Sequence, residues 1–184
     1  MATIFTHSLV ALCVTGGLHS RTPRLFYVVA ALSSIVPDLD VIGFRHGIAY
    51  SDPLGHRGLS HSLLFAFLWS FLCMELFFRN SLPLNTLRGA AHFFLLFACT
   101  SSHGLLDGLT DGGLGVAYFA PFDNTRYFLP WRPIAVSPIG AGAFFSERGA
   151  RVLQNELLIV WSWAVSLLAA SLCIRLVYRR RQKN

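Results

Sequence analysis

Apolar residues gather in five runs, which are separated by polar connections of very different length. The runs cover residues 3–19, 25–36, 59–78, 89–109 and 157–178. A helix needs about 20 apolar residues to cross the hydrocarbon core of a bilayer. The last three runs reach this length, and the first two are shorter. The pattern predicts an all-α, polytopic membrane bundle of four or five transmembrane or re-entrant helices, with the first two runs forming a short hairpin.

The overall composition is that of an integral membrane protein. Hydrophobic residues make up 54% of the 184 residues and charged residues 13%, whereas about 25% of a soluble domain is charged. No repeat or low-complexity segment is evident, so residues 1–184 are expected to form one integral membrane domain. The start of the chain lacks the basic region of a signal peptide, and we expect the first run to remain in the mature protein.

The net charge of +6 does not indicate nucleic-acid binding. Basic residues are densest in Arg179–Lys183, directly after an apolar run, where they are typical of a cytoplasmic stop rather than of a soluble basic face. Each of the four cysteines lies within an apolar run and none forms a CxxC pair, which indicates buried free thiols.

The distribution of Lys and Arg predicts how the chain is oriented in the membrane. If all five runs cross and the Arg179–Lys183 tail is cytoplasmic, nine of the fifteen basic residues lie on the cytoplasmic side. The other six are spread over two long loops, residues 37–58 and 110–156, on the outer side. The C-terminus is therefore predicted to be cytoplasmic.

The loop of residues 110–156 is rich in Gly, Pro and aromatic residues, a composition that favours irregular turns over helix. Irregular backbone is not stable when exposed to lipid, so we expect this loop at the interface or folded over the helix ends. Its aromatic side chains are either interfacial anchors or a lid over an acyl chain. Arg126 and Arg132 are candidates for holding a phosphate head group, or further anchors.

Candidate metal ligands lie at the outer ends of four runs. Ionisable groups at such positions are costly and usually functional, so their convergence at one level predicts a common site. Imidazole and carboxylate groups without thiolate suit zinc or a comparable divalent ion, and we expect one to three ions. The seven candidates are His7, Asp38, Asp40, His56, His61, His103 and Asp107.

The spacing of His103 and Asp107 supports this site, because residues four apart share one face of a helix. Asp111 continues that face if the helix persists beyond Gly108.

Asp38 and Asp40 follow a proline, and in extended chain residues two apart project to the same side. Either both reach the ion, or one binds it while the other orients a histidine. Gly58 permits a backbone bend that turns His56 and His61 inward.

The order of these clusters resembles the LexA-regulated, membrane-bound metal-dependent hydrolase family of bacterial inner-membrane proteins. The resemblance covers roughly residues 5–135, and its specific part is the PDLD and HRGxSHS pair. It rests on Thr6-His7, Pro37-Asp38-Leu39-Asp40, His56-Arg57-Gly58-x-Ser60-His61-Ser62, His103-x-x-x-Asp107, Thr110 and Pro121-Phe122. Ser60 stands where Thr is more often expected. The resemblance implies an inner-membrane location and hydrolysis, but no substrate. Together with the orientation predicted from charge, this location puts the site on the periplasmic side.

A more distant similarity runs to zinc-dependent phospholipase C and the P1-type nucleases, which are helical enzymes. Carried over by motif order, it implies that His7, Asp38, His61, His103 and Asp107 are ligands. The match breaks at the start of the chain, because those enzymes use a mature N-terminal Trp amine and this sequence begins with Met1. The number of metal ions therefore stays open.

These observations predict a metal-dependent hydrolase that cleaves a phosphoester or ester bond of a lipid-like substrate. Asp38 or Asp40 is expected to act as general base or bridging ligand, and Arg57 to neutralise developing negative charge. The alternative is a non-catalytic membrane protein, such as a transporter component or stress-response scaffold, in which a metal or an Asp/His network joins helices. The sequence does not indicate an oligomeric state.

Overall fold

The computed structural model describes residues 1–18 and 22–181 and is all-helical over these residues. Residue 19 of the first apolar run and Lys183 of the basic tail lie outside them. The only extended pairing in the described chain consists of two isolated bridges, Thr110 with Ile134 and Val116 with Tyr127. The helices are α1 (Ile4–Leu18), α2 (Arg24–Ser33), α3 (Leu63–Cys73), α4 (Leu87–Gly108), α5 (Ala141–Phe144), α6 (Glu147–Glu156) and α7 (Ser162–Arg181).

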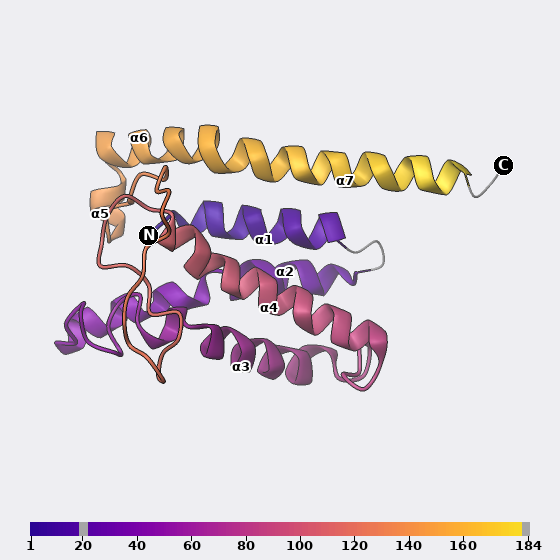
Figure 1. Ribbon diagram of the computed structural model, residues 1–184, viewed down its shortest axis with the longest axis horizontal. Helices are drawn as coiled ribbons and strands as arrows, with labels where there is room; N and C mark the ends of the chain where they lie inside the picture. The colour runs from indigo at the N-terminus through magenta and orange to yellow at the C-terminus, as the bar shows by residue number, and fades with distance from the viewer. Residues whose placement is uncertain (19–21, 182–184) are drawn as a thin grey trace.

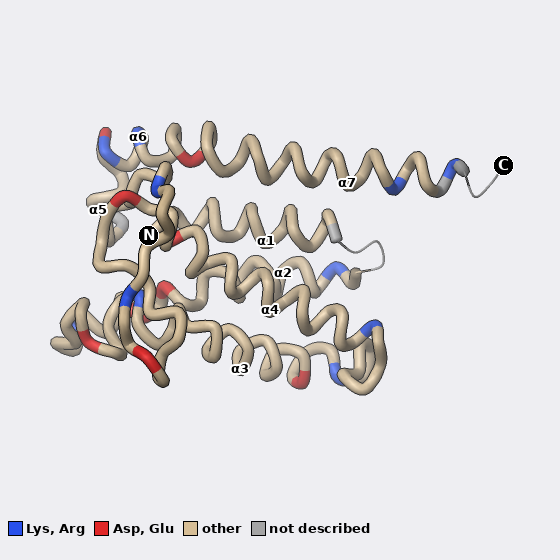
Figure 2. The backbone as a smooth tube through the Cα atoms, in the orientation of Figure 1, with Lys and Arg blue, Asp and Glu red and all other residues tan. Residues whose placement is uncertain are grey.

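The long helices run side by side with alternating direction (Figure 1). One end of the bundle, which we call the N-terminal end, holds the start of α1, the segment after α2 and the loop that follows α4. The opposite end holds the α3–α4 connection and the end of α7. Acidic residues gather at the N-terminal end, as the expected topology requires (Figure 2). Glu75 is an exception, because it follows α3 in the turn Met74–Phe78.

The core lies between α1, α2, α3 and α4. Phe26, Met74 and Leu96 are fully buried there, because the apolar faces of four helices meet around α4. By contrast, only 6% of the most apolar window of Glu147–Tyr178, which comprises α6, η4 and most of α7, is buried. This last stretch is therefore the most lipid-exposed of the apolar helices, in agreement with its uniformly apolar sequence.

Three helical stretches are long and apolar enough to cross a membrane, namely Arg24–His46, Leu87–Gly108 and Glu147–Tyr178, and two shorter apolar helices cover Ile4–Gly17 and Leu63–Phe78. The prediction of a polytopic helical membrane bundle is confirmed.

The second run was predicted to end before Pro37, and here the expectation was wrong. The α-helix ends at Ser33, but a 3₁₀ helix, η1 (Val36–His46), continues the chain and ends at Gly47, whose φ is +77°. A proline is tolerated in the first turn of a helix, because its missing N–H has no helical partner there. The assignment of residues 37–58 as loop is thus correct only from Gly47 onward.

The third run begins its α-helix later than predicted, at Leu63 rather than Leu59. Residues Leu59–His61 form a separate short turn, η2, and the hydroxyl of Ser62 caps α3 by accepting a hydrogen bond from Phe65 N at 3.0 Å. A π-helical turn, η3 (Met74–Phe78), completes this stretch.

Residues 110–156 were predicted to be loop throughout, but their last part is helical. Helix α6 continues through a π-helical turn, η4 (Leu157–Trp161), into α7. The apolar-run criterion missed α6 because its sequence is polar; only Gly149, Val152 and Glu156 of this helix are buried.

Candidate metal centre

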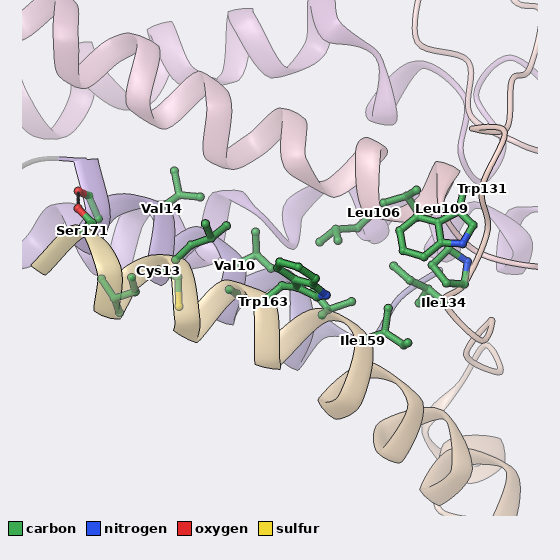
Figure 3. A pocket seen from close by; sticks show the side chains of 16 residues that line it. Val10, Cys13, Val14, Leu106, Leu109, Trp131, Ile134, Ile159, Trp163 and Ser171 are labelled. Atoms are coloured by element: carbon green, nitrogen blue, oxygen red, sulfur yellow. Dashed lines mark hydrogen bonds between the residues drawn. The ribbon is translucent and has the colours of Figure 1, made fainter. Parts of the chain in front are cut away.

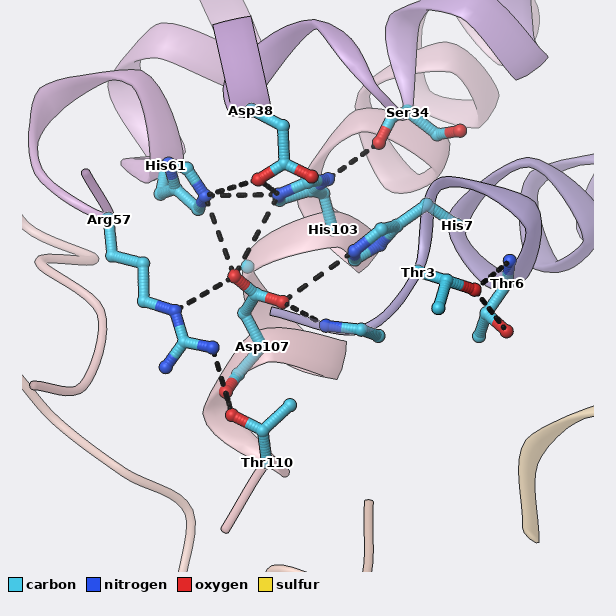
Figure 4. A network of polar contacts seen from close by, with 12 residues as sticks. Thr3, Thr6, His7, Ser34, Asp38, Arg57, His61, His103, Asp107 and Thr110 are labelled. Atoms are coloured by element: carbon cyan, nitrogen blue, oxygen red, sulfur yellow. Dashed lines mark hydrogen bonds and ion pairs between the residues drawn. The ribbon is translucent and has the colours of Figure 1, made fainter. Parts of the chain in front are cut away.

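Four side chains from three elements converge at the N-terminal end of the bundle (Figure 4). They are Asp38 on η1, His61 on η2, and His103 and Asp107 on α4, and one ligand atom of each lies within 4.8 Å of the others. His103 Nε2 is 3.3 Å from Asp38 Oδ1 and 4.0 Å from Asp107 Oδ2. His61 Nε2 is 3.6 Å from both of these carboxylate oxygens. All four residues are buried.

The hydrogen bonds on the far side of each ring fix the imidazole tautomers. His103 Nδ1 lies 2.7 Å from the carbonyl oxygen of Ser34, which can only accept, so Nδ1 carries the proton. His61 Nδ1 likewise faces Asp40 Oδ2 at 3.1 Å. Both Nε2 atoms therefore point into the cluster, where they face each other at 3.0 Å, close enough to share one proton or to bind one cation.

This arrangement fits a divalent cation. Two imidazole lone pairs and two carboxylate oxygens repel one another unless a positive charge lies between them. Tetrahedral zinc with ligands at about 2.0–2.1 Å would separate those ligands by about 3.3 Å, close to the observed distances. Both oxygens of Asp38 are buried without a hydrogen-bond partner, which leaves them available to a metal, and Oδ2 of Asp107 is in an ion pair with Arg57 Nε at 3.0 Å.

His7 lies directly beside the four-residue cluster. Its ring stacks on His103 with a centroid distance of 3.8 Å, and its Nε2 is 3.6 Å from Asp107 Oδ1. The side chain is fully buried and neither ring nitrogen has a hydrogen-bond partner. His7 is thus placed to act as a fifth ligand or as a proton acceptor.

Asp40 and His56 form a second group that shares His61 with the first. Asp40 Oδ1 pairs with His56 Nδ1 at 2.7 Å, while Asp40 Oδ2 accepts from Ser60 Oγ at 2.6 Å and from Arg57 N at 3.1 Å. A carboxylate with this many partners is suited to orienting the two histidines. His56 Nε2 is buried without a partner.

Asp38 and Asp40 therefore differ in role for a reason that the sequence did not show. They were expected in extended chain, where both would project to one side, but they lie on a 3₁₀ helix. With three residues per turn, side chains two apart diverge. Asp38 faces Nε2 of His61, inside the cluster, and Asp40 faces Nδ1 of His61, on the opposite side of the ring.

The guanidinium of Arg57 is fully buried and engaged with the protein. Its Nε pairs with Asp107 Oδ2 at 3.0 Å, and its Nη1 and Nη2 donate to Gly112 O and Thr110 Oγ1, each at 2.9 Å. The backbone of Arg57 has φ of +63°, a rare conformation for a residue with a side chain. These contacts hold Asp107 in place.

Arg126 and Arg132 do not reach the cluster. Arg126 donates to the backbone carbonyls of His56, Tyr50 and Asp52, at 2.8, 2.9 and 3.0 Å, and so ties the loop before His56 to the loop after α4. The guanidinium of Arg132 lies 4.7 Å from the centre of the Phe128 ring.

Asp111 also lies away from the site. Helix α4 ends at Gly108, and Asp111 is exposed and accepts a hydrogen bond from Val136 N at 2.8 Å.

Two glycines of α4 allow the loops to lie close to the site. A Cβ on Gly104 would be 3.0 Å from His61 O, and a Cβ on Gly108 would collide with the hydroxyl of Tyr118. That hydroxyl donates to Gly104 O at 2.9 Å. Burial, with a contribution from the charge of Asp107, raises the pKa of Tyr118 to about 12, so it remains a donor.

The electrostatics of His61 follow from the acidic groups around it. Burial alone lowers the pKa of an imidazole, but the interactions with Asp107, Asp38 and Asp40 outweigh burial and raise the pKa of His61 well above its ordinary value. The cluster is thus strongly cation-attracting.

Glu156 is a structural partner of the site that sequence reasoning missed. Its fully buried carboxylate accepts hydrogen bonds from Thr3 N at 2.6 Å, Thr3 Oγ1 at 2.5 Å and Thr6 Oγ1 at 2.6 Å. The adjacent Ala2 N donates to Asp107 Oδ1 at 2.8 Å. Glu156 therefore anchors the N-terminal segment, which carries His7 and, through Ala2, contacts Asp107. The only signal in the sequence was that Glu156 is a lone acidic residue just before an apolar run.

Comparison with known proteins agrees with this architecture. Residues 1–181 match the family described as YdjM inner membrane protein. The chain belongs to this family. Its expected character as an integral membrane protein of an inner-membrane family is thereby confirmed.

A relative of known name is similar over most of the chain. The Inner membrane protein YbcI of Escherichia coli (strain K12) is 37% identical over 166 residues, which cover 88% of this chain and 91% of that protein. No solved structure matches the chain. Neither the YdjM description nor the name of this relative states a reaction, a metal or a substrate.

Proposed function

We propose that this protein is a membrane-embedded, metal-dependent hydrolase that cleaves a phosphoester or ester bond of a lipid-like substrate. The observation that carries the proposal is the convergence of two imidazole Nε2 atoms and two buried carboxylates, Asp38 and Asp107, within 4.8 Å of one another. Both oxygens of Asp38 are buried without a hydrogen-bond partner. Structural zinc sites are mostly built from cysteine, whereas catalytic ones are typically histidine and carboxylate. The four cysteines lie elsewhere, three of them buried and Cys173 exposed.

In this proposal Asp38, His61, His103 and Asp107 hold one divalent ion, with zinc the best match to the ligand set. Such an ion supplies acidity to a water molecule and polarises the scissile group of the substrate. Asp38 has a second unpartnered oxygen, which accepts the proton of the attacking water.

The remaining polar residues act as supports or as proton carriers. Asp40 orients His61 and His56, and Arg57 fixes Asp107 through Nε. His7 has two unpartnered ring nitrogens beside Asp107. The single N–H of its neutral ring would protonate the leaving group, and the proton that Asp38 takes from the attacking water would then restore that N–H.

The position of the cluster supports a lipid-like substrate. Its members lie at the ends of apolar helices, where the polar head groups of a bilayer begin. The exposed aromatic side chains at this end, among them Phe122 and Trp131, are typical of the membrane interface.

Assays of phosphodiesterase and phospholipase activity on detergent-purified protein, with and without added zinc, test the proposal. We expect hydrolysis that a chelator abolishes, that zinc restores, and that His61→Ala removes. Activity that is unchanged by both chelator and His61→Ala would overturn it.

The burial of all four ligands favours a second candidate function, in which a structural metal joins η1, η2 and α4. A structural site fills every coordination position with protein, whereas a catalytic site keeps one for water or substrate. A protein that binds one ion tightly, shows no water among its ligands and hydrolyses none of the assayed phosphoesters or esters would support this alternative.

A further inference from the structure

The continuous helix formed by η4 and α7 is attached to α1 at two separate places. Toward the N-terminal end, Trp161 Nε1 donates to Thr6 Oγ1 at 2.7 Å, next to the contacts of Glu156. Toward the other end, Ser171 Oγ donates to Gly17 O at 2.5 Å, and Arg175 donates to the carbonyls of Gly16 and Gly17. Between these attachments, no hydrogen bond joins the described residues of the two helices.

An apolar groove of about 650 Å³ lies along this unattached stretch (Figure 3). Its walls come from α1, the end of α4, the loop around Trp131 and α7. The side chains that line it are almost entirely hydrocarbon or indole; the hydroxyl of Ser171, at one end, is already engaged with Gly17. The groove offers a ligand apolar contact and little hydrogen bonding.

One end of the groove lies on the helical turns that carry two of the candidate ligands. Leu106 and Leu109 line it and flank Asp107 on α4, and Val10 lines it one turn after His7 on α1. The same helical turns thus carry two candidate ligands, Asp107 and His7, and side chains that line the groove. One end of a molecule lying in the groove would therefore be at the same level along the bundle as the cluster.

The size of the groove limits its occupant. A membrane-spanning helix is about 10 Å wide and 30 Å long, and so would fill on the order of 2,000 Å³. The groove is several times smaller, although it is within the range of about 300–1,000 Å³ of small-molecule sites. A slender chain fits it, and a helix of a second copy does not.

We propose that this groove binds one acyl chain of a membrane phospholipid and places its ester and phosphate groups beside the metal centre. In a bilayer, acyl chains would contact this stretch, because Glu147–Tyr178 is long and apolar enough to cross a membrane and only 6% of its apolar window is buried. The reading of the groove as a substrate subsite rests on the proposed function, whereas the binding of the chain does not.

The experiment uses a phospholipid with a photoreactive diazirine in the middle of one acyl chain. Purified full-length protein is reconstituted with it in nanodiscs, illuminated in the presence of a chelator, and mapped by mass spectrometry. We expect labelling of Val14, Leu106 and Leu168 to exceed severalfold that of Leu68 and Leu72, which are exposed on α3 away from the groove.

Filling the groove should remove this preference. Ala164 lines the groove and is partly exposed, so Ala164→Trp should reduce groove labelling to the level on α3, whereas the matched change Leu68→Trp should not. If Ala164→Trp does not fold, as judged by size-exclusion chromatography, Ala164→Leu replaces it, and the wild-type map remains decisive on its own.

Equal labelling of the groove and α3 in the wild type would mean that the probe reports only non-specific contact with the surrounding lipid. This result would overturn the inference. Displacement of the label by a polyprenyl phosphate but not by unlabelled phospholipid would overturn the choice of an acyl chain. Because the experiment needs neither metal nor turnover, its failure is distinct from failure of the hydrolase proposal, which is read from the zinc-dependent assays.

Discussion

The Nε2 atoms of His61 and His103 lie 3.0 Å apart, and both Nδ1 protons are committed to acceptors on the outer side of each ring. Two imidazole nitrogens at this distance either share a proton or bind a common cation. The positions of the protons, set by Ser34 O and Asp40, therefore matter as much as the ligands themselves.

Replacing Asp40 by Asn tests this orienting role. Asn keeps the size of the side chain but loses the charge that holds the Nδ1 protons of His56 and His61. We expect metal affinity to fall by about 10–100-fold, as for other carboxylates that hydrogen-bond to the outer nitrogen of a metal-bound histidine. Competition with a chromophoric chelator measures it. Asp111→Asn, at an exposed carboxylate away from the cluster, is the control and should leave affinity unchanged; equal affinity in Asp40→Asn and wild type would refute the role.

A second prediction concerns the close contact between Gly108 and Tyr118. A methyl group on Gly108 would collide with the Tyr118 hydroxyl, so Gly108→Ala should destabilise the protein by about 1–3 kcal/mol, as overpacking does elsewhere. Thermal unfolding in detergent measures this loss. Adding Tyr118→Phe should recover part of it, and Gly142→Ala, where a Cβ meets nothing, should be neutral. A Gly108→Ala protein as stable as wild type would contradict the packing described here.

At the scale of elements, the helical unit of α6 and α7 is joined to α1 by Glu156, directly before the π-helical turn η4. This carboxylate accepts three hydrogen bonds while fully buried. Single-turn π-helical insertions are frequent at functional sites, and here the insertion follows the residue that anchors the start of α1.

Glu156→Gln should therefore weaken both the fold and the metal centre. An amide offers one accepting oxygen, so buried donors of Thr3 or Thr6 lose their partner, at a cost of about 1–3 kcal/mol. Because Ala2 N and His7 are carried by the same segment, metal affinity should fall as well. Unfolding midpoints and chelator competition measure the two effects. Glu147→Gln, at the exposed start of α6, should change neither; a Glu156→Gln protein with unaltered metal affinity would show that the anchor serves stability alone.

The sequence predicted the apolar elements well and the polar ones poorly. Helices α3, α4 and α7 coincide with long apolar runs, because burial in lipid or core requires such runs. Helix α6 has no such run, and η1 has a proline in its first turn, so both were assigned to loops. Their helical state depends on tertiary contacts, such as those of Glu156 with α1, that no local pattern contains.

The convergence of the site was also predictable, because alternating passes bring the ends of four runs to one level. Seven candidate residues were named from that topology, and all of them lie in or directly beside the cluster. Their division into roles was not predictable. It depends on the 3₁₀ geometry of η1, which turns Asp38 and Asp40 to different sides, and on acceptors from the backbone such as Ser34 O.

For the whole molecule, the predicted orientation places the metal centre on the periplasmic side. In a cysteine-free background, Phe122→Cys at the N-terminal end should react with a membrane-impermeant maleimide on intact cells with a permeable outer membrane. Leu87→Cys, at the opposite end, should react only after lysis. Both positions are highly exposed, at 85% and 90%, so reactivity reports sidedness. The reverse pattern would show that the centre faces the cytoplasm.

X-ray absorption of the detergent-purified protein tests the central claim most directly, because it identifies the metal and its ligands together. The structure predicts one divalent ion per chain with only nitrogen and oxygen ligands at about 2.0–2.1 Å, histidine among them. The signal should disappear in His103→Ala. A folded wild-type protein that binds no stoichiometric metal, or one whose spectrum shows sulfur at about 2.3 Å, would contradict the account.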